Sequence, residues 1–195
     1  PVRKKLGAQI RKMFVAGPDM VLVDADYSQI ELRLLAAISG DETMISAFRA
    51  DEDIHTRTAA EINGVAMEEV TPDMRRAAKA TNFGIVYGIS SFGLARNAGI
   101  ARKEADRFIA TYFERYPGVR RFMDDCVKQG YETGYAQTMF GRRRELFELH
   151  SANRNVRNFG ERAAMNTPVQ GTAADIIKLA MVQVDKRLRE EYPEI

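Results

Sequence analysis

Four side chains at four-residue intervals constrain this chain more than any other feature of its sequence. They are Arg75, Lys79, Phe83 and Tyr87. The dipeptide Thr71–Pro72 precedes them and is a strong helix start, because proline is preferred at the first helical position. A helix over 72–87 would carry the four side chains in one slowly winding stripe about 18 Å long.

The stripe has cations in its first half and aromatic rings in its second. A buried face would not carry arginine and lysine, and a solvated face would not carry phenylalanine and tyrosine. A ligand that is charged at one end and flat at the other resolves this conflict, since a polyphosphate can bind the cations while a base stacks on a ring. The alternative is a helix half-buried at its far end, with snorkelling cations.

A carboxylate follows a predicted strand near the start of the chain. Residues 20–25 are apolar and rich in valine, which predicts a buried strand, and a helical pattern then runs to Gly40. Asp26 lies at the junction, where a carboxylate on a rigid base is well placed to hold a divalent ion. Two alternatives stay open: Asp26 could only cap the helix, and Glu31 could only complement its dipole.

The rest of the chain predicts mostly helices. Between residues 135 and 146, β-forming residues around Gly141 predict a hairpin. Pro168 is expected to interrupt the helical pattern near the C-terminal end. The remaining helices are expected over 41–48, 53–62, 90–98, 102–115, 117–130, 153–165 and 173–190.

The net charge of +2 hides a basic–acidic–basic layout. Residues 3–12 and 142–162 are basic, and residues 24–53 are acidic. This layout suits a protein that binds phosphates and also binds a cation. The alternative is that the charged runs are simply solvated faces. The single cysteine, Cys126, excludes an internal disulfide and favours a reducing compartment, so we expect a cytoplasmic protein. It also argues against structural zinc, and no apolar run is long enough to span a membrane.

Three segments together resemble the family A DNA polymerases of the bacterial polymerase I type. Asp26-Tyr27-Ser28-Gln29-Ile30-Glu31-Leu32-Arg33 resembles motif A, residues 75–88 resemble motif B, and residues 167–175 resemble a third block. The order and spacing fit along nearly all 195 residues. The resemblance implies an α+β fold that is mostly helical, namely part of a polymerase palm, with an incomplete antiparallel sheet, and helical fingers.

The resemblance also implies a division of the chain into three parts. Residues 1–40 would be a palm segment with motif A, and residues 41–130 would be fingers with the motif B helix at 72–87. Residues 131–195 would return to the palm, with a hairpin and helices that contact template and primer. The family's His-Asp-Glu turn, which carries the second catalytic aspartate, is absent, and we expect it after Ile195.

The resemblance implies a role for each site residue in template-directed DNA synthesis by two-metal phosphoryl transfer. Asp26 and the Tyr27 carbonyl would hold Mg²⁺, and two such ions are expected in the complete enzyme. Lys79 would act in catalysis as a proton donor to pyrophosphate. The residues implied in binding the deoxynucleoside triphosphate are Gln29, Glu31, His55, Arg75, Lys79, Phe83 and Tyr87, with Glu31 as the gate against a 2′-hydroxyl. Those implied in binding primer–template DNA are Tyr87, Arg162, Asn166 and Gln170.

Two other function classes remain open at this stage. A catalytically silent nucleic-acid-binding module would need the basic segments but not Asp26 paired with the stripe on 72–87. A small polyphosphate-binding protein would need neither the arginines at 142–144 nor the helix that carries Arg162 and Gln170. We expect the full-length enzyme to be a monomer, and the isolated fragment to be inactive because the second catalytic carboxylate is missing.

Overall fold

Helices form most of the chain, as the sequence predicts. The structure, a computed structural model, describes residues 9–10 and 12–193. Its α-helices are α2 (Ile30–Ser39), α3 (Glu42–Arg49), α4 (Ile54–Asn63), α5 (Pro72–Val86), α6 (Ser91–Ala98), α7 (Arg102–Arg115), α8 (Pro117–Thr133), α9 (Arg154–Asn166) and α10 (Thr172–Glu191). Short 3₁₀ turns, η1 (Met67–Glu69) and η2 (Phe147–His150), and one π-helical turn, η3 (Thr167–Gly171), complete the helical elements described.

The helix ends lie where the capping residues predict them. The side chains of Asp41, Asp53, Thr71, Ser90 and Asn153 each accept a hydrogen bond from a backbone N–H at the start of a helix. Such caps satisfy N–H groups that have no partner inside the helix. Gly40 and Gly64 end α2 and α4 in the left-handed region, which glycine adopts without strain.

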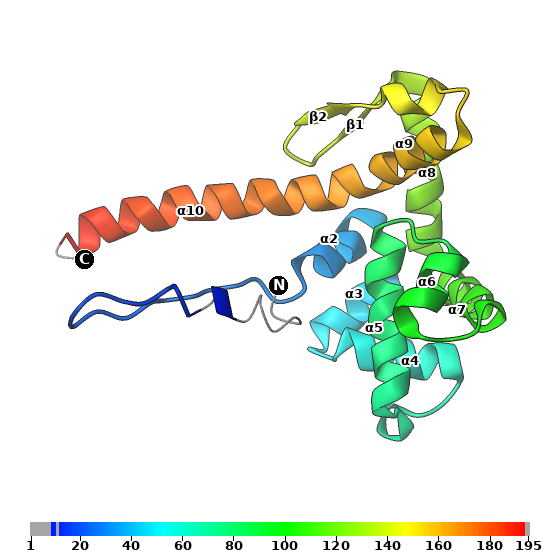
Figure 1. The fold of residues 1–195 in the computed structure, drawn as a ribbon, viewed down its shortest axis with the longest axis horizontal. Coiled ribbons are helices and arrows are strands. Elements are labelled where there is room, and N and C mark those ends of the chain that lie inside the picture. The colour runs from blue at the N-terminus through cyan, green and yellow to red at the C-terminus, as the bar shows by residue number, and fades with distance from the viewer. Residues whose placement is uncertain (1–8, 11, 194–195) are drawn as a thin grey trace.

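One hydrophobic core joins α2 through α8. Leu35, Met44, Leu94 and Tyr112 are among its fully buried side chains. Residues from η3 and the start of α10 also reach this core. A second, smaller cluster lies between the hairpin, η2 and α9. Figure 1 shows α8 running from the main group of helices to this second cluster.

A buried polar contact between α3 and α8 helps to hold the main core together. Asp41 caps α3 and also accepts a hydrogen bond from the backbone N–H of Gly118 over 2.8 Å. A Cβ atom at position 118 would lie 2.9 Å from the backbone of Asp41. Only glycine therefore allows the first turn of α8 to approach α3 this closely.

The expected hairpin is present. Strands β1 (Tyr135–Gln137) and β2 (Arg143–Glu145) pair antiparallel, with Ala136 opposite Arg144. The fold is therefore α+β and mostly helical, as predicted. Pro168 interrupts the α-helical pattern between α9 and α10, as expected. It lies in the single π-helical turn η3, which continues directly into α10.

The prediction of a buried strand over 20–25 is wrong. These residues have no regular secondary structure, and the exposed fractions of the side chains from Met20 to Val23 range from 64% to 87%. A strand needs a hydrogen-bonding neighbour and a layer to cover its apolar side chains. Among the described residues the sheet consists of β1 and β2 alone, so this segment has neither.

The interpretation of Asp26 as a helix cap is also wrong. Helix α2 begins after Gln29, which is its N-cap residue in the left-handed conformation (φ 55°) and makes no side-chain capping bond. Figure 1 shows the extended N-terminal segment and α10 leaving the helical group toward the same side. Within 9–10 and 12–193, no helix is long and apolar enough to cross a membrane.

Candidate functional site

Three of the four stripe residues on α5 line a cleft with a volume of about 1070 Å³. Lys79, Phe83 and Tyr87 line it, and the side chains of Phe83 and Tyr87 are 37% and 42% exposed. The aromatic half of the stripe therefore faces the cleft and not the core. The ammonium of Lys79 lies 5.9 Å from the centre of the Phe83 ring, so a cation and a stacking surface are adjacent.

Arg75 belongs to the same stripe, yet it does not line this cleft. Its Nε donates to Oδ2 of Asp53, the N-cap of α4, over 2.7 Å. Burial raises the pKa of Asp53, but hydrogen bonds from Arg75, Thr56 and the backbone N–H of His55 outweigh burial and lower this pKa to about 2. Asp53 is therefore ionised at neutral pH and holds the Arg75 guanidinium at the N-terminal end of α4.

His55 lies between α4 and α5, with only 3% of its surface exposed. Its ring centre is 5.8 Å from that of Phe83, and its Nδ1 is 3.1 Å from Nδ2 of Asn82. Burial lowers the pKa of His55 to about 4; Asp53 acts in the opposite direction, and Lys79 and Arg75 add to the lowering. The imidazole is therefore neutral at pH 7.

Glu31 lies at the C-terminal end of α5, although 56 residues separate it from Tyr87. The Tyr87 hydroxyl donates to Oε2 of Glu31 over 3.1 Å. Burial and the Glu31 carboxylate raise the pKa of Tyr87, whereas the Gln170 side chain lowers it. Glu31, Tyr87 and Gln170, which the sequence assigns to nucleotide and DNA binding, thus lie together at one end of the cleft.

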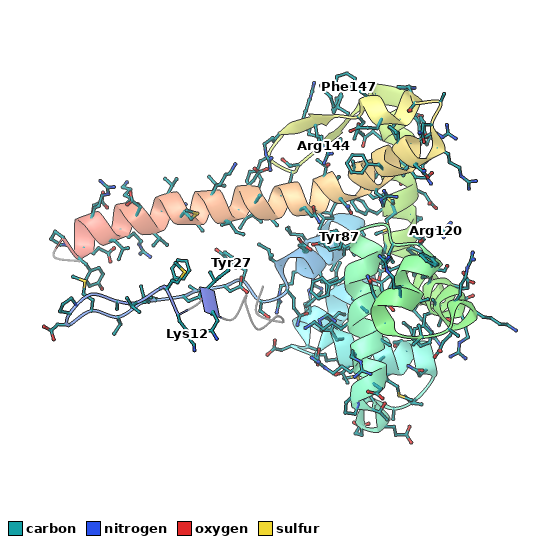
Figure 2. The ribbon with its side chains drawn as sticks, in the orientation of Figure 1. Lys12, Tyr27, Tyr87, Arg120, Arg144 and Phe147 are labelled. Carbon is teal, nitrogen blue, oxygen red and sulfur yellow. The ribbon has the colours of Figure 1, made fainter. Side chains whose placement is uncertain are left out.

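The predicted metal ligands, Asp26 and Tyr27, lie on the exposed segment that precedes α2. Figure 2 labels Tyr27 on this segment and Tyr87 on the helical group. Carboxylate and carbonyl oxygens are ligands that Mg²⁺ prefers, but an octahedral ion needs about six. Within the described residues, no three acidic, histidine or cysteine side chains gather in one place. Asp26 and Tyr27 therefore amount to only a partial donor set.

Gln29, the remaining residue of the motif A prediction, is partly buried at the start of α2. Its Oε1 is sealed from solvent and has no hydrogen-bond partner among the described residues. A buried amide oxygen without a partner is uncommon in folded proteins.

Three of the four predicted DNA-binding residues line a second pocket of about 250 Å³, whereas the fourth, Tyr87, lines the α5 cleft. Arg162, Asn166 and Gln170 come from α9 and η3, and they line this pocket together with the hairpin arginines at 142–144. Arg162 lines both this pocket and the α5 cleft, so the two are adjacent. Gly88, which follows α5 at φ 61°, fits closely against Arg162, since a Cβ there would lie 2.9 Å from Arg162 Cγ.

The three hairpin arginines have different surroundings. Arg142 donates to Oδ1 of Asp175 and to the Gly171 carbonyl, each over 2.9 Å, and so holds the hairpin against α10. Arg143 lies 4.3 Å from the centre of the Tyr135 ring, and Arg144 lies 5.8 Å from that of Phe159. Figure 2 shows Arg144 on the hairpin. The other basic segment, residues 3–12, lies mostly outside the described residues.

Sequence reasoning missed residues that the tertiary structure places at the site. Arg76, rather than Arg75, lines the α5 cleft. Its spacing of three and seven residues from Lys79 and Phe83 is also a helical-face spacing, and would have identified it. Asn82 was missed as well, although it is a polar residue on the face of α5 that carries Ala78 and Ile85.

Comparison with known proteins finds similarity along the whole chain. The model for "DNA polymerase family A" matches residues 1–195. DNA polymerase I of Caldicellulosiruptor bescii is 56% identical over 190 residues, which cover 97% of this chain and 22% of that protein. DNA polymerase I of Bacillus caldotenax is 55% identical over 192 residues, which cover 98% of this chain and 22% of that protein.

A solved structure with a similar fold is the POL domain of Pol1 from M. smegmatis, in complex with DNA primer–template and dNTP. The TM-score is 0.87 at 44% sequence identity, and the match covers 98% of this chain and 34% of that one. The chain therefore spans about a fifth of the length of the curated relatives that it matches, and about a third of this structure.

Proposed function

Because the chain belongs to DNA polymerase family A, we propose that it is part of an enzyme that adds deoxynucleotides to the 3′ end of a primer as a template directs. The observation that carries this proposal is the adjacency of two clefts. One offers a cation beside exposed aromatic rings, and the other is basic and shares Arg162 with the first. A nucleotide and a duplex could thus bind next to each other.

In this proposal the α5 cleft takes the incoming deoxynucleoside triphosphate. Lys79 and Arg75 bind the phosphates through charge-assisted contacts, with His55 and Gln29 beside the triphosphate. Of the two cations, Lys79 lines the cleft, and Arg75 would have to leave Asp53 to reach the phosphates. Phe83 packs on the base, and Glu31 closes the space where a ribonucleotide would carry its 2′-hydroxyl. Lys79 also lies on the phosphate side and would give a proton to the pyrophosphate that leaves. Positioning and charge stabilisation of this kind account for most of the catalysis of phosphoryl transfer.

The second pocket takes the primer–template duplex near the new base pair. Arg162, Asn166 and Gln170 contact the strands, and Tyr87 packs at the templating position. The proposed layout has a palm segment at 1–40, fingers at 41–130 and a return to the palm at 131–195. Helix α2 packs in the same core as the fingers helices, so motif A and motif B are held against each other.

Family A polymerases use divalent metal ions, and two Mg²⁺ would stabilise the attacking and leaving oxygens of an in-line displacement. Asp26 and the Tyr27 carbonyl are the ligands that this chain would contribute. Within the described residues no group of three acidic, histidine or cysteine side chains could hold an ion, so water, the triphosphate or other residues of the polymerase would supply the remaining ligands.

Primer extension by the polymerase that contains this chain tests the proposal. Extension with Mg²⁺ and four deoxynucleotides is expected for the wild type and should be lost in Asp26→Asn. The matched control is Asp19→Asn, an exposed aspartate on the same segment, which should keep wild-type extension. Retained DNA binding without extension by the wild-type protein would instead favour a catalytically silent binding module.

A further inference from the structure

The ion pair between Arg75 and Asp53 joins the start of α5 to the start of α4. Arg75 Nε donates to Asp53 Oδ2 over 2.7 Å, and the two side chains are 45% and 36% exposed. Water screens charges that are this exposed, so the pair contributes little to stability. A more highly charged ligand can therefore take the guanidinium from the carboxylate.

The two partners differ in their freedom to move. Asp53 Oδ2 also accepts from the Thr56 hydroxyl over 2.8 Å, and its Oδ1 accepts from the backbone N–H of His55 over 3.0 Å. Both bonds lie within the capped first turn of α4 and do not need Arg75. Within the part of the chain that the structure describes, the Arg75 side chain makes no hydrogen bond except the one to Asp53. Arg75 is therefore the partner that moves when the pair opens, and Asp53 stays hydrogen-bonded.

The order of the residues along α5 indicates which part of a nucleotide would reach Arg75. Phe83, Lys79 and Arg75 follow one another toward the N-terminal end of the helix, and each step of four residues rises about 6 Å. With the base on Phe83 and the phosphates at Lys79, as in the proposed function, Arg75 lies one further turn along the phosphate chain. The terminal phosphate of a triphosphate would reach it, whereas a diphosphate is one phosphate shorter.

We propose that Asp53 is a positioning residue that competes with the terminal phosphate of the nucleotide for Arg75. The proposal rests on the proposed function, because the deoxynucleoside triphosphate is the ligand. Without nucleotide, Asp53 balances a cation that lies near the positive end of the α5 dipole. When a triphosphate binds, its terminal phosphate takes over this role. The competition lowers affinity for triphosphates alone, since only a ligand that engages Arg75 must break the ion pair.

The substitution Asp53→Asn tests this competition. Asparagine caps a helix as well as aspartate does, so α4 keeps its cap while the carboxylate charge is lost. The probes are a deoxynucleoside triphosphate and the matching diphosphate, titrated into the polymerase that contains this chain, on a template whose primer ends in a dideoxynucleotide. We expect the Kd of the triphosphate to fall about two- to fivefold in Asp53→Asn, as for release from an exposed ion pair. The Kd of the diphosphate should keep its wild-type value, which also shows that the variant is folded.

Two controls separate competition for Arg75 from a general effect of charge. Glu52→Gln removes the neighbouring carboxylate, which pairs with Arg57 over 2.7 Å and not with Arg75, and should leave both Kd values unchanged. In an Arg75→Ala background, Asp53→Asn should no longer tighten triphosphate binding, because Asp53 acts through Arg75.

Weaker triphosphate binding in Asp53→Asn would show that Asp53 holds Arg75 in place for the phosphate, and would overturn the proposal. An unchanged Kd would overturn it too, as would equal tightening for the diphosphate or in the Arg75→Ala background. Primer extension on an unblocked primer is measured separately. If the wild-type polymerase binds the nucleotide but extends no primer, the proposed function fails, while the titrations still decide whether Asp53 competes for Arg75.

Discussion

The hydroxyl of Tyr87 donates a hydrogen bond to Oε2 of Glu31 over 3.1 Å, which joins the C-terminal end of α5 to the first turn of α2. The contact holds the Glu31 carboxylate beside Tyr87, which lines the α5 cleft. Because the hydrogen bond restricts its movement, the Glu31 side chain can block the space that another chemical group, such as a sugar hydroxyl, would need.

Replacing Glu31 with alanine should therefore weaken discrimination between sugars. The space under C2′ would open, and we expect ribonucleotide incorporation relative to deoxyribonucleotide to rise by about tenfold or more, which corresponds to about 1.4 kcal/mol. Single-nucleotide incorporation by the complete polymerase measures the ratio. Glu31→Gln, which keeps the volume and an acceptor for Tyr87, is the control, and an unchanged ratio in Glu31→Ala would show that Glu31 is not the gate.

Lys79 should act on the nucleotide and not on the duplex. Lys79→Ala removes a charge-assisted contact worth about 1.5–3 kcal/mol, so nucleotide binding and turnover should fall. Steady-state kinetics and a primer–template binding assay separate the two effects. Lys103→Ala, an exposed lysine on α7, is the matched control. Equal losses of DNA affinity and nucleotide affinity would place Lys79 against the duplex.

The hairpin arginines should differ in their effect on DNA binding. Arg143 and Arg144 are expected to neutralise phosphates, so their joint replacement by alanine should flatten the dependence of log K on log salt by up to about 0.9 per phosphate on B-form DNA. Arg142→Ala should instead loosen the hairpin, because Arg142 is bound to Asp175. Titrations at several salt concentrations measure the slope, with Arg187→Ala on α10 as the control. A slope that does not change would assign Arg143 and Arg144 to a solvated surface.

His55 should make folding less favourable in mild acid. Its pKa is about 4 in the folded chain and about 6.5 when unfolded, so the unfolded chain takes up a proton first as the pH falls. The free energy of unfolding should therefore fall by about 2–3 kcal/mol as the pH drops from 6.5 to 4, and His55 should not lower it above pH 6.5. Denaturant unfolding of the wild type and His55→Gln at pH 7 and pH 4.5 measures this. The same loss in both proteins would rule His55 out as the cause.

The 195-residue chain by itself is expected not to extend a primer. Asp26 and Tyr27 provide only part of the coordination that a magnesium ion needs. The exposed apolar side chains of residues 20–23 and of the far half of α10 should also make the isolated chain prone to association. A primer-extension gel on the purified chain tests this. Extension that Asp26→Ala abolishes would show that the chain holds a complete metal site.

The helices of this chain follow from local signals, which is why they could be predicted. Thr71 and Pro72 begin α5, and Gly64 ends α4, because capping and the left-handed turn depend only on neighbouring residues. The stripe on α5 and the hairpin follow from residue spacing in the same way. The motifs at 26–33 and 75–88 also identified the family, since they lie within short stretches of sequence.

Tertiary structure decided what depends on a distant partner. The pattern at 20–25 favours a strand, but a strand forms only beside another strand, and the described residues place none there. Asp53 holds Arg75 away from the cleft and leaves Arg76 to line it, although the two arginines are adjacent in sequence. Asn82 meets His55 only because α4 and α5 pack together. Periodicity predicts which side chains share one face of a helix. It does not predict which other element packs on that face, because the contacting residues are far apart in sequence.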